Sequence, residues 1–201
     1  SSLIRGLITF LCSLAPAGVA QWEFEGDLAS AVGGAPLTLG AAEPVSQPSV
    51  AFSVVSIGGA ETTAAVFSRG TYFRMPNGLA SGGGGRYLNQ YTIIMDVLFP
   101  DRSPSGGWAA LVQTDPANAS DGDWFVNPAS GIGISGTYGG TVTDGEWHRL
   151  GLVVDLAAGS LTSYLNGARV MGLQGLTLDG RFAAQEEILL FADENGENAV
   201  G

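Results

Sequence analysis

A short segment near the end of the chain gathers the side chains best suited to holding a metal ion. Residues 193–198 read DENGEN, so five oxygen-bearing side chains surround one glycine. Calcium takes six to eight hard oxygen ligands from carboxylates, amides and backbone carbonyls, and the candidate ligands here are Asp193, Asn195 and Glu197. The EF-hand spacing is not met, because the glycine falls at the fourth position. The segment predicts either a structural calcium site or a polar turn between two strands.

Aromatic side chains beside turns are the candidates for binding a sugar, whose C–H faces pack on aromatic rings. Trp124 follows an acidic loop, Trp108 follows two glycines, and Tyr138 lies among glycines and threonines. Trp22 and Trp147 each head a strand with apolar neighbours, which is typical of core residues. A tryptophan in a sandwich is more often a core residue than a binding platform, so these positions suggest a ligand surface without identifying its ligand.

The carboxylates and the histidine do not form a recognisable catalytic set. Glu23, Glu25 and Asp27 share one face of an expected strand, as the paired carboxylates of a glycoside hydrolase would, but they lie at the start of the domain. His148 is the only histidine, so any Ser-His-Asp triad must include it. Its place inside a strand favours a structural, hydrogen-bonded role. We therefore expect a protein that is not an enzyme, with a divergent glycoside hydrolase as an alternative.

The strands that must position these side chains are clearest in residues 143–170. An Asp-Gly turn precedes the β-forming run 147–155, and a short loop then leads to a second run at 161–165. The Asn-Gly pair at 166–167 supplies the positive φ angles of a tight hairpin turn, and residues 168–171 begin a third strand. The segment predicts a three-stranded antiparallel meander.

Short β-forming runs separated by turn signals fill the rest of the chain. Further strands are expected at residues 21–27, 36–39, 50–57, 64–67, 71–75, 91–99 and 108–113. No segment after residue 20 carries the 3.6-residue period of an amphipathic helix. Glycine makes up 31 of 201 residues, about twice its average share, which fits many turns. The sequence predicts one all-β domain, a two-sheet antiparallel sandwich or jelly roll.

Several motifs within this pattern resemble a known family. They are GEWHRL at 145–150, the strands and Asn-Gly turn at 154–167, DGRF at 179–182 and LLFADENGE at 189–197. Together they resemble the laminin-G-like jelly roll of the concanavalin A-like lectin/glucanase superfamily, over nearly all of residues 21–201. The glucanase motif Glu-x-Asp-x-x-Glu does not occur here.

This resemblance implies the concanavalin A-like fold, and it implies function only by analogy. Calcium sites are common in such sandwiches, so the resemblance favours the calcium interpretation of residues 193–198. A late strand of the fold lies beside the N-terminal one, and the sequence given stops as it enters that strand. The domain 21–201 is therefore expected to be truncated at its C-terminus.

The charge of the chain bears on its partners. Nineteen acidic residues stand against eight basic ones, all arginines, which gives a net charge of −11. A chain this acidic repels nucleic acid and anionic membrane surfaces. We expect neither as a partner.

Residues 1–20 are interpreted as a secretory signal peptide. Arg5 gives a positive start, and residues 7–14 form an apolar run too short to span a bilayer. Gly18 and Ala20 fit the small residues required before a cleavage site. A buried N-terminal helix is the alternative. The only cysteine would leave with the peptide, and no later run is long enough for a membrane anchor.

These observations favour a secreted, non-catalytic recognition module that binds carbohydrate or another extracellular surface ligand. It would carry a structural calcium and form part of a larger multidomain chain. The alternative is a structural or adhesion spacer domain of a larger extracellular protein, without a small ligand of its own.

Overall fold

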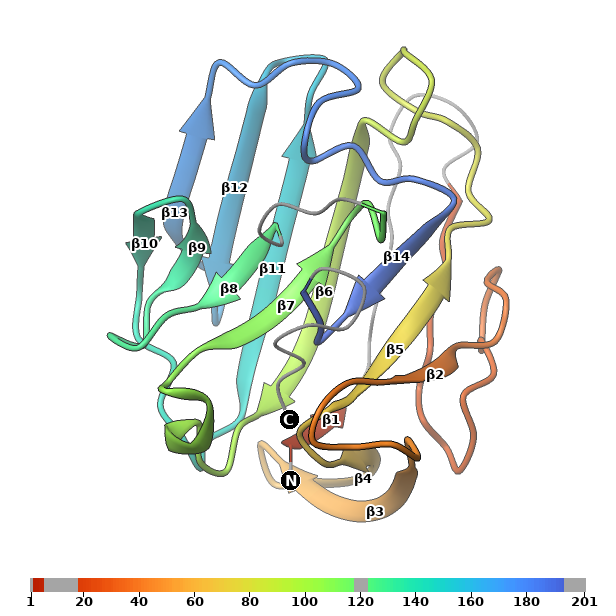
Figure 1. Ribbon diagram of the computed structural model, residues 1–201, viewed down its shortest axis with the longest axis vertical. Helices are drawn as coiled ribbons and strands as arrows, with labels where there is room; N and C mark the ends of the chain where they lie inside the picture. The colour runs from red at the N-terminus through yellow and green to blue at the C-terminus, as the bar shows by residue number, and fades with distance from the viewer. Residues whose placement is uncertain (1, 6–17, 118–122, 194–201) are drawn as a thin grey trace.

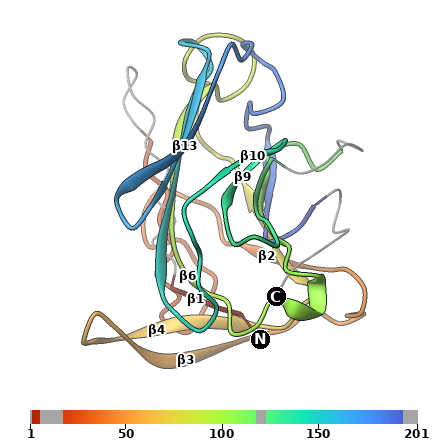
Figure 2. The same ribbon diagram turned by 90° about the vertical axis from the view of Figure 1, so that its left-hand side faces the viewer.

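Two antiparallel sheets lie face to face in the computed structural model of the chain, which describes residues 2–5, 18–117 and 123–193 (Figure 1). Each sheet has seven strands, and the described residues contain one short 3-10 helix, η1 (Ser103–Ser105), and no α-helix. The fold is a jelly-roll-like β-sandwich, which confirms the predicted fold class. In the edge-on view of Figure 2 the two layers are seen from the side.

The first sheet has the strand order β13-β12-β11-β6-β1-β4-β3. Its strands are β1 (Ser2–Arg5), β3 (Val50–Ile57), β4 (Ala60–Phe67), β6 (Gln90–Leu98), β11 (His148–Asp155), β12 (Ser160–Leu165) and β13 (Ala168–Gln174). Strands β11, β12 and β13 pair in sequence order, so the predicted meander is confirmed. Strand β6 then pairs along the whole of β11.

The second sheet has the strand order β10-β9-β8-β7-β14-β5-β2. Its strands are β2 (Thr38–Ala41), β5 (Thr71–Pro76), β7 (Ala109–Gln113), β8 (Trp124–Val126), β9 (Ile132–Ile134), β10 (Thr137–Gly139) and β14 (Glu187–Leu190). Apart from the four-residue β1, the strands of the first sheet have six to nine residues, whereas those of the second have three to six. The second sheet lies in front of the first in Figure 1.

The core fills the space between the two sheets. Because side chains alternate between the faces of a strand, Leu150, Leu152 and Val154 of β11 all point inward and are buried. Trp124 of β8 reaches across from the second sheet, and its indole N–H donates to Ser163 Oγ of β12 at 2.9 Å. This bond satisfies both buried polar groups and fixes how the two layers face each other.

Residues 21–27 differ from the sequence-based expectation of a strand. Trp22 and Phe24 are buried while Glu23 and Glu25 are exposed, so the alternation predicted correctly which side chains face the core. The backbone, however, does not run as a strand, because Phe24 has a φ of 56°, in the left-handed region. The segment is irregular chain that closes one side of the core.

Strand β1 lies in the middle of the first sheet, where it pairs with both β4 and β6. Cleavage after Ala20 would remove this strand and leave β4 and β6 without their shared neighbour. The signal peptide stays a prediction. N-terminal sequencing of the secreted protein tests it, since Gln21 as the first residue would support cleavage and an intact Ser1 would contradict it.

Candidate functional site

An exposed aromatic cluster lies at one end of the second sheet. It consists of Trp108, Phe125 and Tyr138, and we call it the Trp108 surface. The centroid of the Trp108 ring lies 6.1 Å from those of Phe125 and Tyr138, with interplanar angles of 85° and 69°. Trp108 is 42% exposed and Phe125 is 8% exposed. The indole therefore rests edge-on against its neighbours and still presents a large apolar area to solvent.

The strand register explains how these three rings meet. Phe125 of β8 and Tyr138 of β10 both pair with Gly133 of β9, so they form one row across three strands. Trp124 precedes Phe125 and points into the core, so Phe125 and Tyr138 lie on the outer face of the sheet. Gly133 contributes no side chain to this row. A Cβ at this position would lie 2.0 Å from the Thr137 carbonyl oxygen, so the close pairing of β9 with β10 requires glycine here.

A buried arginine holds the loop that carries Trp108. Arg102 is only 6% exposed, and its Nε donates to Asp144 Oδ1 at 2.5 Å. Its terminal nitrogens donate over 2.9–3.3 Å to four further acceptors, namely the carbonyl oxygens of Gly107, Asn127 and Val142 and the hydroxyl of Ser130. These acceptors lie in three separate loops. One guanidinium therefore links the three loops beside the Trp108 surface.

Two glycines complete the turn before Trp108. Gly106 and Gly107 have φ angles of 67° and 84°, which side chains other than glycine rarely adopt. A Cβ on Gly107 would also lie 3.0 Å from the Cα of Pro128. The turn therefore needs glycine both for its backbone angles and for its close approach to the neighbouring loop.

Trp124 does not belong to this surface, although its position after a loop suggested a ligand-binding role. It is fully buried and its indole N–H is bonded within the core. A side chain without an exposed face cannot stack on a ligand, so we remove it from the candidate site. The structure brings Trp108 and Tyr138 together and adds Phe125. Sequence analysis singled out neither Phe125 nor Arg102.

Only one of the three predicted calcium ligands falls among the described residues. Asp193 is buried, while Asn195 and Glu197 lie outside the ranges that the structure describes. Within those ranges no group of three or more histidine, cysteine or acidic side chains is placed to hold a metal ion. Calcium binding by residues 193–197 stays a prediction.

Two of the three carboxylates considered for catalysis make local contacts, while Glu25 Oε2 accepts a hydrogen bond from the Thr63 hydroxyl of β4 at 3.4 Å. Glu23, Glu25 and Asp27 are all exposed, and Asp27 Oδ1 accepts a hydrogen bond from the backbone N–H of Ala29 at 2.9 Å. Glu23 Oε1 accepts one from the side chain of Gln21 at 2.5 Å. Since they lie on irregular chain, they do not share the single strand face that the glycosidase alternative required.

His148 occupies a structural position in β11. Its side chain is buried, and Nε2 accepts a hydrogen bond from the backbone N–H of Thr143 at 3.0 Å. The side-chain amide of Asn166 lies 3.3 Å from Nδ1. The imidazole therefore lies between the turn that precedes β11 and the Asn166 turn that joins β12 to β13.

A second charged cluster links Asp123, just before β8, to Arg181, which lies 58 residues later in the sequence. Asp123 is buried, and its Oδ1 accepts a hydrogen bond from Arg181 Nε at 3.0 Å. Its Oδ2 accepts one from the backbone N–H of Thr114 at 2.8 Å and lies 2.5 Å from the hydroxyl of the same residue. Burial raises the pKa of Asp123, and the bonds from Thr114 and Arg181 offset only part of that increase.

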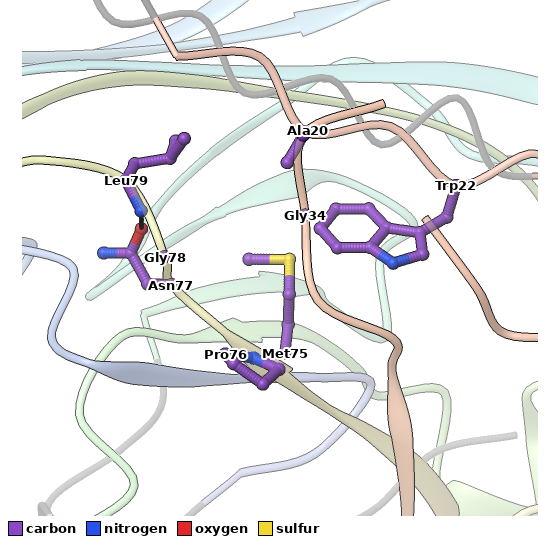
Figure 3. Close-up of a pocket in the computed structure, with 9 residues that line it drawn as sticks. Ala20, Trp22, Gly34, Met75, Pro76, Asn77, Gly78 and Leu79 are labelled. Atoms are coloured by element: carbon purple, nitrogen blue, oxygen red, sulfur yellow. Dashed lines mark hydrogen bonds between the residues drawn. The ribbon is translucent and has the colours of Figure 1, made fainter. Parts of the chain in front are cut away.

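A small pocket lies beside β5 and close to the predicted cleavage site. Figure 3 shows Ala20 and Trp22 on one side and Met75 and Leu79 on the other. The backbone N–H of Leu79 donates to Asn77 Oδ1 at 3.4 Å. The lining contains no charged or titratable side chain, so this pocket offers no group for acid–base or metal chemistry.

Comparison with known proteins assigns no family. No protein-family model and no curated protein matches the sequence. Among solved structures the chain is similar to domain 4 of AbnA, a GH43 extracellular arabinanase from Geobacillus stearothermophilus, in complex with arabinotriose. The identity is 17% and the TM-score 0.48, over 86% of this chain and 91% of that one. The sandwich described above rests on its own strand pairing. No helix among the described residues is long and apolar enough to cross a membrane.

Proposed function

We propose that this chain is a non-catalytic recognition module that binds carbohydrate through the Trp108 surface. The observation that carries the proposal is the exposure of Trp108, which remains 42% exposed although two aromatic rings pack against it. A large indole held at the surface by a specific loop leaves apolar area that a ligand can cover, and removing that area from water would favour binding. The apolar face of a sugar ring fits such a platform, while its hydroxyls need polar neighbours.

Two polar side chains lie in the loops beside the platform, and both make hydrogen bonds within those loops. The hydroxyl of Ser105 and the amide of Asn127 belong to the two loops that Arg102 ties together, and neither residue is fully buried. The guanidinium itself is occupied by its own acceptors, so it fixes the platform and is not free to bind a ligand. A rigid aromatic platform binds with little loss of side-chain entropy.

Replacing Trp108 with alanine is expected to weaken carbohydrate binding strongly. An aromatic residue at the centre of a binding surface commonly contributes about 2 kcal/mol or more, which corresponds to about a thirtyfold weaker Kd. Binding would be measured by affinity electrophoresis against a panel of soluble β-glucan, xylan, mannan and arabinan, followed by calorimetry on any polysaccharide that retards the wild-type protein. Tyr138→Ala should weaken binding by a smaller factor.

Leu178→Ala is the matched control, because Leu178 is also an exposed apolar side chain, at 45%, and lies outside the Trp108 surface. It should bind as the wild type does. If no polysaccharide binds the wild type, the proposal fails. If one binds and Trp108→Ala binds it equally well, the site lies elsewhere on the molecule.

The finer features of this function are also proposals. We infer that the module is secreted, belongs to a larger extracellular protein and is laminin-G-like, as the sequence motifs suggest. A structural or adhesion spacer domain remains the alternative, and the absence of any glycan ligand for the wild-type protein would favour it.

Calcium binding at residues 193–197 should stabilise the folded domain. A ligand that binds only the folded state raises the free energy of unfolding, by about 2.7 kcal/mol at a hundred times Kd. Excess chelator should then lower the melting temperature by several degrees. The variant carrying Asp193→Asn and Glu197→Gln should lose this sensitivity. Identical melting of the wild type with calcium and with chelator would contradict the proposal.

A further inference from the structure

The chain around the predicted cleavage site after Ala20 is closely packed. Ala20 is buried and lines the small apolar pocket of Figure 3 together with Trp22 and Leu79. Glycine allows the neighbouring chain to come close, since a Cβ on Gly33 would lie 2.1 Å from the Val19 carbonyl oxygen. Cleavage after Ala20 would therefore create a new N-terminus beside an apolar pocket.

The fold holds the backbone of Gln21, the residue that this cleavage would leave first. Its N–H donates to the Val32 carbonyl oxygen at 2.9 Å, and its own carbonyl oxygen accepts from the Ala31 N–H at 2.7 Å and from the Ser30 hydroxyl at 3.0 Å. All three partners lie within the part of the chain that remains after cleavage. The new α-amino group is therefore held at a defined place on the folded domain.

The side chain of Gln21 is placed for a reaction with that α-amino group. It is only partly buried, and its amide nitrogen donates a hydrogen bond to Glu23 Oε1 at 2.5 Å. A carboxylate in contact with a leaving nitrogen can transfer a proton to it. In an N-terminal glutamine the amine and the side-chain Cδ are also separated by the right number of bonds to close a five-membered ring.

We propose that Gln21 of the exported protein is a modification site, at which the N-terminal glutamine cyclises to pyroglutamate. The α-amino nitrogen attacks Cδ of its own side chain, so a C–N bond of the lactam forms and the Cδ–Nε2 bond breaks. The amine loses one proton, which Glu23 passes to the departing nitrogen, and that nitrogen leaves as ammonia. The reaction needs no oxidant, reductant or second substrate. The proposal rests on the proposed secretion and is independent of carbohydrate binding.

Cyclisation suits the surroundings of the new terminus. An α-ammonium ion beside an apolar pocket loses part of its hydration, which costs free energy, whereas the lactam is uncharged. The pocket lining that the structure describes contains no charged side chain to offset such an ion. The lactam also removes the free amine on which aminopeptidases act, so the N-terminus of the exported protein would be protected from them.

Mass spectrometry and Edman degradation of the exported protein test the proposal. The full 201-residue chain would be expressed and its exported product isolated. We expect the mass of residues 21–201 less one ammonia, and no Edman sequence until pyroglutamyl aminopeptidase exposes Trp22. A product that begins with an unmodified Gln21 would overturn the cyclisation and leave the secretion intact. A product that still begins at Ser1 would overturn both.

Gln21→Asn is the matched control, because it keeps the amide and shortens the side chain by one methylene. Attack by its amine would require a four-membered ring, so the same cleavage should give an N-terminus that Edman degradation reads directly. Glu23→Gln should slow cyclisation by about tenfold, less than the hundredfold or more of enclosed enzyme sites because Glu23 is exposed. The readout is the fraction of blocked protein at fixed times after export. Equal rates with and without the carboxylate would overturn the proton transfer through Glu23, and a blocked Gln21→Asn product would overturn the lactam.

Discussion

The Arg102→Ala variant is expected to lose about 3–5 kcal/mol of the free energy of unfolding, the range found when one partner of a buried ion pair is removed. The guanidinium is 6% exposed and donates five side-chain hydrogen bonds, one of them to Asp144. Without it, the carbonyl oxygens of Gly107, Asn127 and Val142 lose their donors at once, and leaving the buried Val142 oxygen unsatisfied costs free energy. Urea unfolding followed by far-UV circular dichroism measures the loss.

Two further variants interpret this result. Arg102→Lys separates the hydrogen bonding of the guanidinium from its charge, and Arg86→Ala is a control for the loss of an arginine elsewhere. Arg102→Lys keeps the charge, but its ammonium has only three donors and cannot reach five acceptors, so most of the loss should remain. Arg86→Ala removes an exposed arginine that also lies over an aromatic ring and should change the stability by no more than about 0.5 kcal/mol. A loss below about 1 kcal/mol for Arg102→Ala would show that the loops hold together without it.

Most long strands of the first sheet were predictable from the sequence because they have their own local signals, whereas β4 was expected only over residues 64–67 and begins at Ala60. Strand β3 begins and ends where the expected run 50–57 does, and β11 and β12 lie within one residue of the expected runs at 147–155 and 161–165. Alternating side chains and an Asn-Gly turn are properties of neighbouring residues, so they need no knowledge of the rest of the fold.

The short strands were missed for the opposite reason. Strands β8, β9 and β10 have three residues each, which is too few to show an alternation, and they form by pairing in a row that begins at β7. Strand β14 lies between β5 and β7, far from either in the sequence. Its four residues became a strand through tertiary pairing.

The candidate site was predicted in part. Trp108 and Tyr138 were identified by type and by the turns around them, but which face of β8 carries Trp124 depends on a register that the sequence does not show. Arg102 gave no local signal at all. Its acceptors lie up to 42 positions further along the chain. Nothing in the neighbouring sequence therefore distinguishes this buried arginine from an exposed one.

The protonation state of Asp123 also depends on contacts with residues distant in the sequence, which its sequence neighbours do not reveal. The Thr114 hydroxyl oxygen lies 2.5 Å from Asp123 Oδ2 and 2.8 Å from the carbonyl oxygen of Arg181. A hydroxyl has one proton and a carbonyl has none to donate. Both contacts are hydrogen bonds at once only if the threonine donates to the carbonyl and a protonated Asp123 donates to the threonine. The raised pKa of Asp123 agrees with this arrangement.

Asp123→Ala is expected to cost about 3 kcal/mol of the free energy of unfolding. The substitution leaves the buried N–H of Thr114 without an acceptor, and it removes the carboxyl that binds Arg181. Arg181 is partly exposed and water can replace some of its contact, so the cost lies at the lower end for a buried pair. Asp123→Asn should cost less, because an amide of the same size can satisfy one of the two Thr114 contacts, either by accepting from the backbone N–H or by donating to the hydroxyl.

The dependence of stability on pH should therefore differ between the wild type and Asp123→Asn. Below the ordinary pKa of 3.8 the carboxyl is protonated in both the folded and the unfolded chain. Above it the folded state still binds the proton that the unfolded state has released, so this contribution to stability falls as the pH rises through the folded-state pKa. The wild type should lose stability relative to Asp123→Asn over that interval, measured by urea unfolding from about pH 3 to about pH 7. A difference between the two proteins that stays constant with pH would mean that Asp123 titrates normally and is ionised in the fold, with the Thr114 hydroxyl donating to it instead of to Arg181.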